Sequence, residues 1–442
     1  FAIWNTMMGT SLLSIAWIIQ KAGLVAAIFC MVGMGLLCLY SAYRVTDSLR
    51  FVKSRINEKR KMRGAGGGLP PKRERLIEFS DVCAEVLGPL GRLSAVIFSV
   101  IALIGTLTVF WQLMSRFAEN LALFCYAMLH RRLNVVISTG LMCASGNRNI
   151  YHEVGFNATV DNTWIHNALA SHYTWPCVLL IIIFPLINIR SPIFFQRFAS
   201  LGTLSIMYLI CYSLFNASQW GINMDLTNRT STHYDKPFKT SFPTMTGVLC
   251  LSFFIHNCIL TLLRFQKNPK NNARDICISF LLVGITYCLL GFPLYLTFPL
   301  PKRCLADNFV QNFSPNDLMA TVTRAFLLLQ YTALFPQIAF ITRVQLFRII
   351  SPGNDHSCVR IFIFNTVIAV ICLLTAVFFP NVGLILRYCG ALSGLAYVFA
   401  LPSLVYIFGM RRLGQLTTNS VIVHLSIIAI GIANFVAQFY QD

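Results

Sequence analysis

Apolar and polar residues alternate in long blocks along nearly the whole chain. Eleven apolar runs contain no Asp or Glu and have nearly the length, about 20 residues, that a helix needs to cross a membrane. They cover residues 2–20, 22–43, 93–115, 174–189, 199–216, 242–263, 276–298, 320–342, 361–379, 384–408 and 419–440, and the fourth is the shortest. This pattern predicts an all-α polytopic membrane protein with eleven transmembrane helices.

Composition supports a membrane protein. Hydrophobic residues make up 56% of the 442 residues and charged residues only 12%. Soluble domains usually carry about 25% charged residues, so the composition excludes an ordinary soluble domain. The chain begins at Phe1, already inside the first run. We therefore expect an N-terminal part of the protein to precede this sequence, and a signal peptide cannot be judged.

The net charge of +19 is unevenly distributed among the loops. Between the second and third runs lie Arg44, Arg50, Lys53, Arg55, Lys59, Arg60, Lys61, Arg63, Lys72, Arg73 and Arg75. Because Lys and Arg concentrate on the cytoplasmic side, loop 44–92 and the N-terminus are predicted to be cytosolic and the C-terminus luminal. The basic residues suit contact with anionic membrane lipid, and a dedicated partner site is the alternative. Residues 79–92 are predicted to form a short interfacial helix.

Two long loops on the predicted luminal side, 117–173 and 217–241, have an irregular, Asn/Ser/Thr-rich pattern. The N-glycosylation sequons begin at Asn157, Asn216, Asn228 and Asn312, and all four fall on this side. Glycan acceptors must be non-cytosolic, so the sequons agree with the charge pattern. Asn216 lies too close to the membrane, which leaves Asn157, Asn228 and Asn312 as predicted glycosylation sites.

Most of the 15 cysteines lie in or next to apolar runs, where a thiol is a small buried apolar side chain. Cys143 and Cys304 lie well within the predicted luminal loops. An oxidising lumen would permit them to pair. No Cys or His spacing in the sequence suggests a metal site.

The first run contains a polar stretch that is unfavourable for a helix, Asn5-Thr6-Met7-Met8-Gly9-Thr10-Ser11. Within a membrane, non-helical backbone is tolerated only where it lines a cavity or is buried in protein. Secondary transporters bind substrate carboxylates and cations at such interruptions. The alternative is a continuous helix that packs closely through small residues, and this stretch alone does not decide between them.

An inverted-repeat carrier should have a second interruption five runs later, in the sixth run. There Ser252 and His256 lie among apolar residues, and polar groups at such depth are costly unless they face a cavity. For His256, hydrogen-bonded packing is the alternative to a role as proton carrier. The matching positions of the two polar stretches favour a carrier.

A bound cation would need neutral oxygen ligands, because the runs contain no Asp or Glu. Asn5, backbone carbonyls of the first run and the hydroxyl of Thr332 form a candidate sodium site. The alternative for Thr332 is a hydrogen bond within its own helix. Arg324 and Arg387, near the ends of their runs, are predicted to extend toward the membrane interface.

Four stretches carry a resemblance to a known family: WNTMMGTSLLSIAW, FPTMTGVLCLSFFIHNCILTLL, NNARDICISFLLVGITY and PNVGLILRYCGALSGLAYVFALPSLVYI. They resemble the first, sixth, seventh and tenth helices of the amino acid/auxin permease group. The similarity is greatest to the lysosomal arginine-sensing branch of the sodium-coupled neutral amino acid transporters, and it extends over nearly all 442 residues. It implies a five-plus-five inverted repeat, residues 1–216 and 242–408, with helices 1 and 6 broken, and an eleventh helix within 409–442.

The resemblance also implies a function. It implies a protein of lysosomal and late endosomal membranes that binds luminal arginine, exports leucine and other essential amino acids, and signals to the target-of-rapamycin complex. Its substrate stretch corresponds to Asn5 through Thr10, its cation threonine to Thr332, and its luminal disulfide to Cys143 and Cys304. The implied partners are Ragulator and Rag GTPases, through a cytosolic N-terminal tail that this sequence does not contain.

Other classes of function fit less well. The sequence contains no His/Asp, Cys/His or paired-carboxylate arrangement typical of an enzyme, and no charge ring or repeated filter loop typical of a channel. No feature indicates nucleic-acid binding. Two alternatives stay open: a plasma-membrane or vesicular sodium-coupled carrier without a sensing role, and an amino-acid receptor with little net transport.

Overall fold

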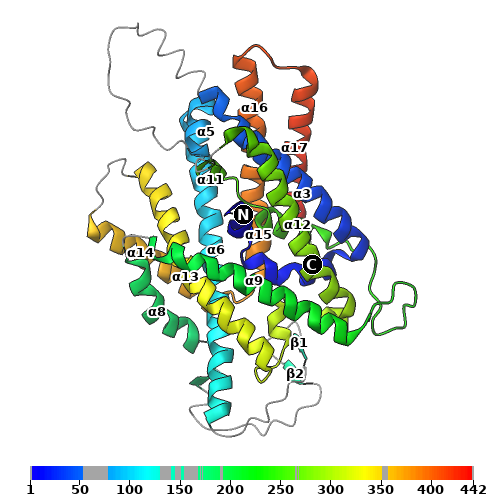
Figure 1. Cartoon of the computed structure of the whole chain (residues 1–442). Helices are drawn as coiled ribbons and strands as arrows, with labels where there is room; N and C mark the ends of the chain where they lie inside the picture. Colours follow the sequence, from blue (N-terminus) through cyan, green and yellow to red (C-terminus); the bar gives the residue numbers. More distant parts are fainter. Residues whose placement is uncertain are drawn as a thin grey trace.

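The computed structural model is a bundle of helices with one small two-stranded sheet (Figure 1). The residues that it describes are 2–52, 78–129, 141–144, 151–153, 168–169, 171, 173–189, 193–263, 266, 268–350 and 357–440.

In the first half of the chain, the first run is divided into three short helices, and each later run forms one. The elements are α1 (Ala2–Met7), the 3-10 helix η1 (Thr10–Ser14), α2 (Ile15–Ala22), α3 (Leu24–Asp47), α5 (Phe79–Leu87), α6 (Pro89–Leu129), β1 (Met142–Ala144), β2 (Tyr151–Glu153), α8 (Thr174–Ile187) and α9 (Ile193–Trp220).

In the second half, the sixth run is divided in two and the tenth contains a π-helical stretch. The elements are α10 (Phe242–Ser252), α11 (Ile259–Leu263), η2 (Pro269–Asn271), α12 (Asn272–Thr297), η3 (Lys302–Cys304), η4 (Phe309–Asn312), α13 (Leu318–Ile350), α14 (Cys358–Phe378), α15 (Val382–Gly394), the π-helix η5 (Leu395–Ala400), α16 (Leu401–Arg412) and α17 (Thr418–Ala437).

Each predicted run therefore coincides with helical structure. Among the described residues, seven helices are long and apolar enough to cross a membrane, and three shorter apolar helices cover 11–22, Thr174–Ile187 and Phe242–Ser252. The protein is thus a mostly helical, multi-pass membrane protein. The count of eleven spans and the inverted repeat stay predictions.

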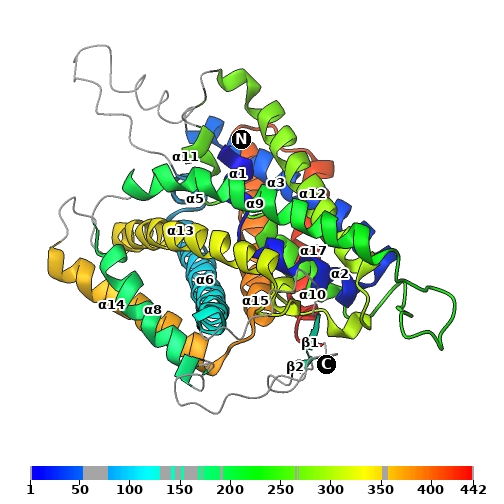
Figure 2. The ribbon, with the colours of Figure 1, turned by 60° about the horizontal axis from the view of Figure 1, so that its bottom comes forward.

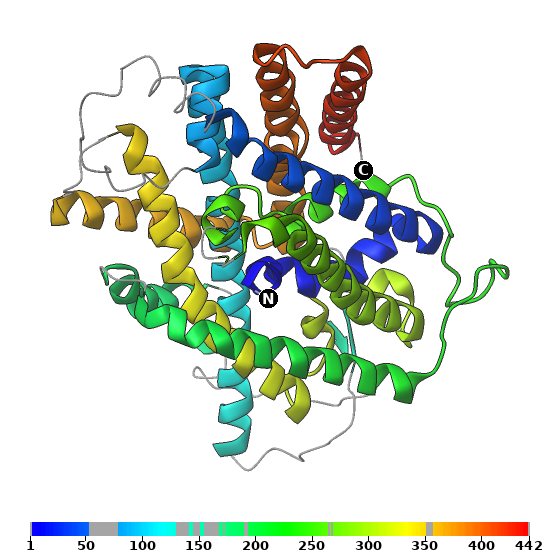
Figure 3. The same ribbon diagram turned by 45° about the horizontal axis from the view of Figure 1, so that its top comes forward.

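The helix α6 is the central column of the bundle (Figure 1). It packs against α13, α15 and α5. Figure 2 shows α8 and α14 side by side on one flank, and Figure 3 shows α16 and α17 side by side. The chain begins inside the bundle, where Ile3 and Trp4 of α1 are buried.

The predicted start of the irregular loop at residue 117 is wrong, because α6 continues to Leu129. Residues 117–129 consist mainly of Ala, Leu, Phe and other residues that a helix accommodates, and they contain neither Gly nor Pro. At the start of this extension, Arg116 forms an ion pair with Glu119 one turn later, at 3.3 Å. Such a pair supports the continuing helix.

A short helix is present where one was predicted over 79–92, but it ends at Leu87 as α5, and contacts hold it at both ends. Its interfacial position stays a prediction. Glu78 and Asp81 form a capping box at its start. The Glu78 carboxylate also pairs with Arg348 of α13 at 2.9 Å. Arg412, at the end of α16, donates hydrogen bonds to the carbonyls of Glu85 and Val86 near the end of α5.

The opposite end of the bundle, which we call the disulfide end, contains the bond between Cys143 and Cys304. Their Cα atoms lie 4.5 Å apart, and the bond joins positions 161 residues apart in sequence. The predicted pairing is confirmed in the structure. The disulfide fixes β1 beside η3, which lies in the segment between α12 and α13.

The prediction that Arg324 and Arg387 extend to the interface is wrong, because both side chains are buried. Arg324 donates hydrogen bonds to the carbonyls of Val310, Phe313 and Ser314. Arg387 donates from Nε to the side-chain oxygen of Gln438 at 2.9 Å and from Nη2 to its carbonyl. Backbone carbonyls, and for Arg387 also the side-chain oxygen of Gln438, supply the acceptors that a buried guanidinium needs.

Candidate functional site

The first predicted interruption is present between α1 and η1. α1 ends at Met7, and Gly9 has an extended backbone with φ −106° and ψ −152°. The Gly9 N–H donates to the Met7 carbonyl at 2.8 Å, a contact between residues two apart that no α-helix makes. The chain then resumes as η1 and continues into α2. The helix is therefore broken where the polar stretch predicted it.

The second interruption lies between α10 and α11. α10 ends at Ser252, α11 begins at Ile259, and the six residues between them are not helical. In these turns the Phe254 N–H donates to the Leu251 carbonyl and the Cys258 N–H to the Ile255 carbonyl, both at 3.1 Å. The sixth run is thus interrupted as well, at the position that carries Ser252 and His256.

The two interruptions meet at one side chain of α12. The Tyr287 hydroxyl lies 3.2 Å from the Met7 carbonyl oxygen and 2.9 Å from the Ser252 carbonyl oxygen, and both contacts are buried. Next to Tyr287 in sequence, Thr286 accepts a hydrogen bond at 3.1 Å from the indole N–H of Trp4. α12 therefore holds the end of α1 and the end of α10 together.

Sequence reasoning missed Tyr287 and Thr286 as members of the site. The signal was present, since they form a polar pair inside the apolar run 276–298. Their partners, however, lie 35 or more residues away along the chain, and no local pattern identifies such contacts.

The predicted substrate residues differ in how far their side chains are buried. Asn5 is half-buried and Thr6 is exposed. Met7, Met8 and Ser11 are buried. Thr10 begins η1, but its side chain lies outside what the structure describes. The stretch thus contributes backbone atoms at Met7 and a polar face at Asn5 and Thr6.

The candidate sodium ligands Asn5 and Thr332 come from different helices, α1 and α13. The Thr332 hydroxyl donates to the Leu328 carbonyl at 2.7 Å, within its own helix, and also contacts the sulfur of Met114 on α6. No hydrogen bond joins Asn5 to Thr332 in the described part of the chain. The intrahelical bond is the alternative that the sequence left open, and the sodium site stays a prediction.

Ser252 and His256 are both buried at the second interruption. The Ser252 hydroxyl donates to the Val248 carbonyl at 2.9 Å, and the His256 ring lies 5.9 Å from that of Phe254. Beside His256, the Asn257 amide donates at 3.2 Å to the Ser99 hydroxyl. Ser99 donates in turn to Gln345 at 2.6 Å, which ties this interruption to α6 and α13.

The predicted glycosylation sites have different surroundings. Asn228 is exposed, and its side-chain oxygen accepts hydrogen bonds from the backbone and hydroxyl of Thr230. Asn157 lies outside the described residues. A glycan on Asn312 does not fit this structure, because the residue is 1% exposed and its side-chain amide donates to the carbonyls of Met142 and Cys304. This asparagine packs the disulfide end instead.

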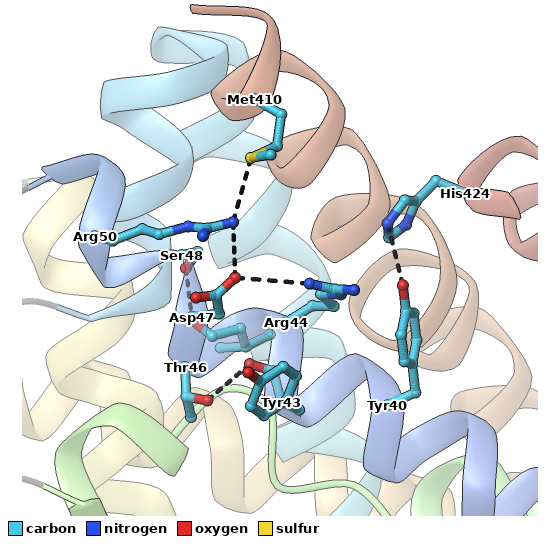
Figure 4. Close-up of polar contacts among 10 residues, drawn as sticks. Tyr40, Tyr43, Arg44, Thr46, Asp47, Ser48, Arg50, Met410 and His424 are labelled. Atoms are coloured by element: carbon cyan, nitrogen blue, oxygen red, sulfur yellow. Dashed lines mark hydrogen bonds and ion pairs between the residues drawn. The ribbon is translucent and has the colours of Figure 1, made fainter. Parts of the chain in front are cut away.

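A second polar cluster lies at the end of α3 (Figure 4). The Asp47 carboxylate pairs with Arg50 at 3.0 Å and lies 3.7 Å from Arg44. The Arg44 guanidinium stands 4.4 Å from the ring centre of Tyr406 on α16. The Tyr40 hydroxyl lies 3.2 Å from Nε2 of His424 on α17. This cluster joins three helices through side chains.

The described residues contain no group of three or more His, Cys, Asp or Glu side chains that could hold a metal ion. In that part of the chain, the oxygens at the interruptions are backbone carbonyls, hydroxyls and an amide. Such neutral oxygens suit an ammonium group or a sodium ion better than a transition metal.

Comparison with known proteins identifies the family. The pattern of the transmembrane amino acid transporter proteins matches residues 1–441. The chain is 38% identical to the sodium-coupled neutral amino acid transporter 9 homolog of Caenorhabditis elegans, over 99% of this chain and 72% of that protein. It is 38% identical to neutral amino acid transporter 9 of Xenopus laevis, over 100% of this chain and 79% of that protein. It is 37% identical to neutral amino acid transporter 9 of Rattus norvegicus, over 100% of this chain and 78% of that protein.

These relatives cover essentially the whole chain, and their names describe transporters, which are not enzymes. The interrupted helices are consistent with this class. The chain belongs to the transmembrane amino acid transporter family, and its substrates are amino acids.

Proposed function

We propose that this transporter resides in lysosomal and late endosomal membranes, binds arginine from the lumen, and exports leucine and other essential amino acids. The observation that carries the proposal is the meeting of two interrupted helices at Tyr287, with the carbonyls of Met7 and Ser252 on the same hydroxyl. The names of the relatives support the choice of substrate class. The lysosomal location and the preference for arginine rest on the family resemblance.

In this proposal the substrate lies across the two interruptions. The carbonyl ends of α1 and α10 carry partial negative charge, which attracts the α-ammonium group. The amides of the chain after Gly9 face the opposite way and receive the α-carboxylate. Both ends of a zwitterion are thus bound by backbone, without a charged side chain in either run.

Sodium is the proposed coupling ion, with Asn5 and Thr332 among its ligands. The Thr332 hydroxyl uses its proton toward Leu328, but a hydroxyl oxygen keeps two lone pairs for a cation. Sodium binds such neutral oxygens without a carboxylate. A direct proton carrier would depend on His256 instead.

The proposed sensing role rests on the same resemblance. In this role, arginine binding alters the contacts of a cytosolic N-terminal tail with Ragulator and Rag GTPases. These partners pass the signal to the target-of-rapamycin complex. The proposed orientation has loop 44–92 and the N-terminus in the cytosol and the C-terminus in the lumen. It rests on the basic residues of that loop.

The site is tested by Thr10→Trp in purified protein, because a large side chain would fill the space beside Gly9. Arginine binding should be lost in this variant and retained in Ser218→Trp, a matched change at an exposed position of α9. Normal arginine affinity in correctly folded Thr10→Trp would refute the site. In proteoliposomes, arginine binding without leucine flux would favour a receptor over a carrier.

The coupling ion is tested by exchanging sodium for choline at fixed pH. Sodium should strengthen amino-acid binding, Asn5→Ala should remove this effect, and His256→Ala should leave it largely intact. Linkage requires the amino acid to tighten sodium binding by the same factor. The proposal would be refuted if amino-acid affinity were the same in sodium and in choline and were lost only in His256→Ala. That result would show that sodium is not the coupling ion and that Asn5 is not the residue responsible.

A further inference from the structure

The polar cluster at the end of α3 contains more positive than negative charge (Figure 4). Nη1 of Arg44 and Nη2 of Arg50 both approach Oδ2 of Asp47, at 3.7 Å and 3.0 Å. Within the described residues, no second carboxylate pairs with either guanidinium. Two guanidiniums carry more N–H donors than one carboxylate can accept. The two arginines therefore have donors and positive charge available for a further anion.

Neither arginine is saturated with strong acceptors. The Arg44 guanidinium lies 4.8 Å from the ring centre of Tyr40 and 4.4 Å from that of Tyr406, so aromatic rings fix its position. Its Nε has no hydrogen-bond partner among the described residues. The second contact of Arg50 is to the sulfur of Met410 at 3.3 Å, and a thioether is a weak acceptor. The Arg50 side chain is 42% exposed, so an incoming acceptor can reach it.

The neighbouring residues of α16 add positive charge. Arg411 and Arg412 directly follow Met410 and are both exposed. Arg412 donates to the carbonyl of Glu85 on α5, which brings one acidic residue close to it. Counted with Arg44 and Arg50 against Asp47 and Glu85, the arginines are in excess. This balance favours a ligand with a net negative charge and disfavours a zwitterion that carries its own cation.

An exposed apolar face of α3 leads to the two arginines. Phe29, Val32, Leu36 and Tyr43 are 74%, 57%, 62% and 42% exposed. Their spacings of three, four and seven residues place them on one side of the helix. In a bilayer such a face contacts acyl chains, and tyrosine and arginine at its end lie at the level of the headgroups. The ligand that matches both parts is a lipid.

We propose that Arg44 and Arg50 bind the phosphate of an anionic phospholipid, whose acyl chain lies along Phe29, Val32 and Leu36. The phosphate supplies the second anion that the two guanidiniums lack, and Asp47 competes with it for the same donors. This site is formed by α3 and α16, so it is separate from the amino-acid site proposed at the interruptions.

The test measures binding of three probes to the purified full chain in a neutral detergent. Dioctanoyl-phosphatidylglycerol has acyl chains and a net negative headgroup. Dioctanoyl-phosphatidylcholine has the same chains and a zwitterionic headgroup, and glycerol 3-phosphate has a phosphate without chains. We expect phosphatidylglycerol to bind most tightly, because it alone combines the two features that the site recognises.

Three variants give the inference its sign. Arg50→Gln removes the more exposed charge and should weaken phosphatidylglycerol binding about fivefold, the contribution of one arginine near a membrane surface. Asp47→Asn removes the competing charge but keeps an acceptor oxygen, and it should tighten binding by a similar factor. Arg274→Gln on α12 is the matched control, since Arg274 is exposed and also pairs with an aspartate, Asp275. It should leave the affinity unchanged.

Several results would overturn the inference. Among the variants, these are wild-type affinity in Arg50→Gln, failure of Asp47→Asn to bind more tightly, and an equal loss in Arg274→Gln. Equal binding of phosphatidylcholine would exclude recognition of net charge, and equal binding of glycerol 3-phosphate would identify a free phosphate as the ligand. The outcome does not depend on the proposed transport function, which Thr10→Trp tests separately.

Discussion

The disulfide end and the interruptions both present clusters of backbone carbonyls, but they satisfy them differently. At the disulfide end the chain supplies its own cations. Arg324 donates to three carbonyls between Val310 and Ser314, and buried Lys302 donates to the carbonyls of Tyr295, Leu296 and Phe298. At the interruptions the donors that face the Met7 and Ser252 carbonyls in the described structure are neutral: the Tyr287 hydroxyl faces both, and the Gly9 N–H donates to Met7.

This difference separates a structural use of carbonyl clusters from a binding use. A carbonyl cluster that is occupied by a built-in cation is permanently closed, and the cation stabilises irregular backbone. A cluster whose donors are one hydroxyl and one backbone amide holds no cation of its own, so its partial negative charge stays available to a ligand. Disruption of the disulfide end should therefore cost stability without changing amino-acid recognition.

The largest effect is expected from Cys143→Ser. Loss of the bond should lower the free energy of unfolding by about 2–5 kcal/mol, because a closed loop of 161 residues restricts the unfolded chain strongly. The effect is measured by thermal unfolding in detergent, with Cys211→Ser as control, since Cys211 is free and exposed. Two alkylatable thiols at 143 and 304 in denatured, non-reduced wild-type protein would contradict the prediction.

Arg324→Met should come next, at about 3 kcal/mol of lost stability. The apolar side chain fills similar space but removes the charged donor to the Val310, Phe313 and Ser314 carbonyls, and hydrogen bonds from charged groups are among the strongest. Arg274→Met is the matched control at an exposed arginine. Arginine affinity at a temperature where the variant is folded should be unchanged. A selective loss of affinity would show that the two clusters are not independent.

The smallest effect concerns pH and Asp307, whose carboxylate accepts the Gly383 N–H at the start of α15, at 2.8 Å. Burial raises the pKa of Asp307 above its ordinary 3.8, against the opposing effect of that hydrogen bond. The folded state then binds the proton more tightly than the unfolded state. The stabilising contribution is therefore fully present below about pH 4 and is lost as the pH rises through the raised pKa.

Asp307→Asn resembles the protonated form, because its amide oxygen can still accept from Gly383. The variant should lose this part of the pH dependence and be slightly more stable than the wild type at pH 7. Melting temperatures of both proteins between pH 4 and pH 7 provide the measurement. Parallel curves for the two proteins would show that Asp307 does not titrate with folding in this range.

The sequence predicted what depends on local composition. The apolar runs became helices because their composition is continuous over the length of each run, and Gly9 marked the first interruption because its neighbours are polar and poor at sustaining a helix. Cys143 and Cys304 were found because few other cysteines lie outside the apolar runs. The stretch 79–92 was also predicted to contain a short helix, and α5 occupies its first part.

The sequence failed where tertiary contacts decide. The polar pair Thr286 and Tyr287 reaches partners about 280 residues away in α1, a distance at which local pattern carries no information. Arg324 was predicted at the membrane interface because an arginine near the end of an apolar run usually extends there. The carbonyls that accept its hydrogen bonds are brought to it by the tertiary fold, which composition does not reveal. Asn312 carries a sequon, yet its amide is used internally.

The fastening of α5 at both ends has a mechanical consequence. One end is bound to α13 through Arg348 and the other to α16 through Arg412. A hydrogen bond tolerates a change in length of about 0.5 Å. If α13 and α16 separate by more than this, α5 can follow only one of them, and the contact to the other must open. This short helix therefore acts as a crossbar, and the contact that breaks first records which of the two helices has moved.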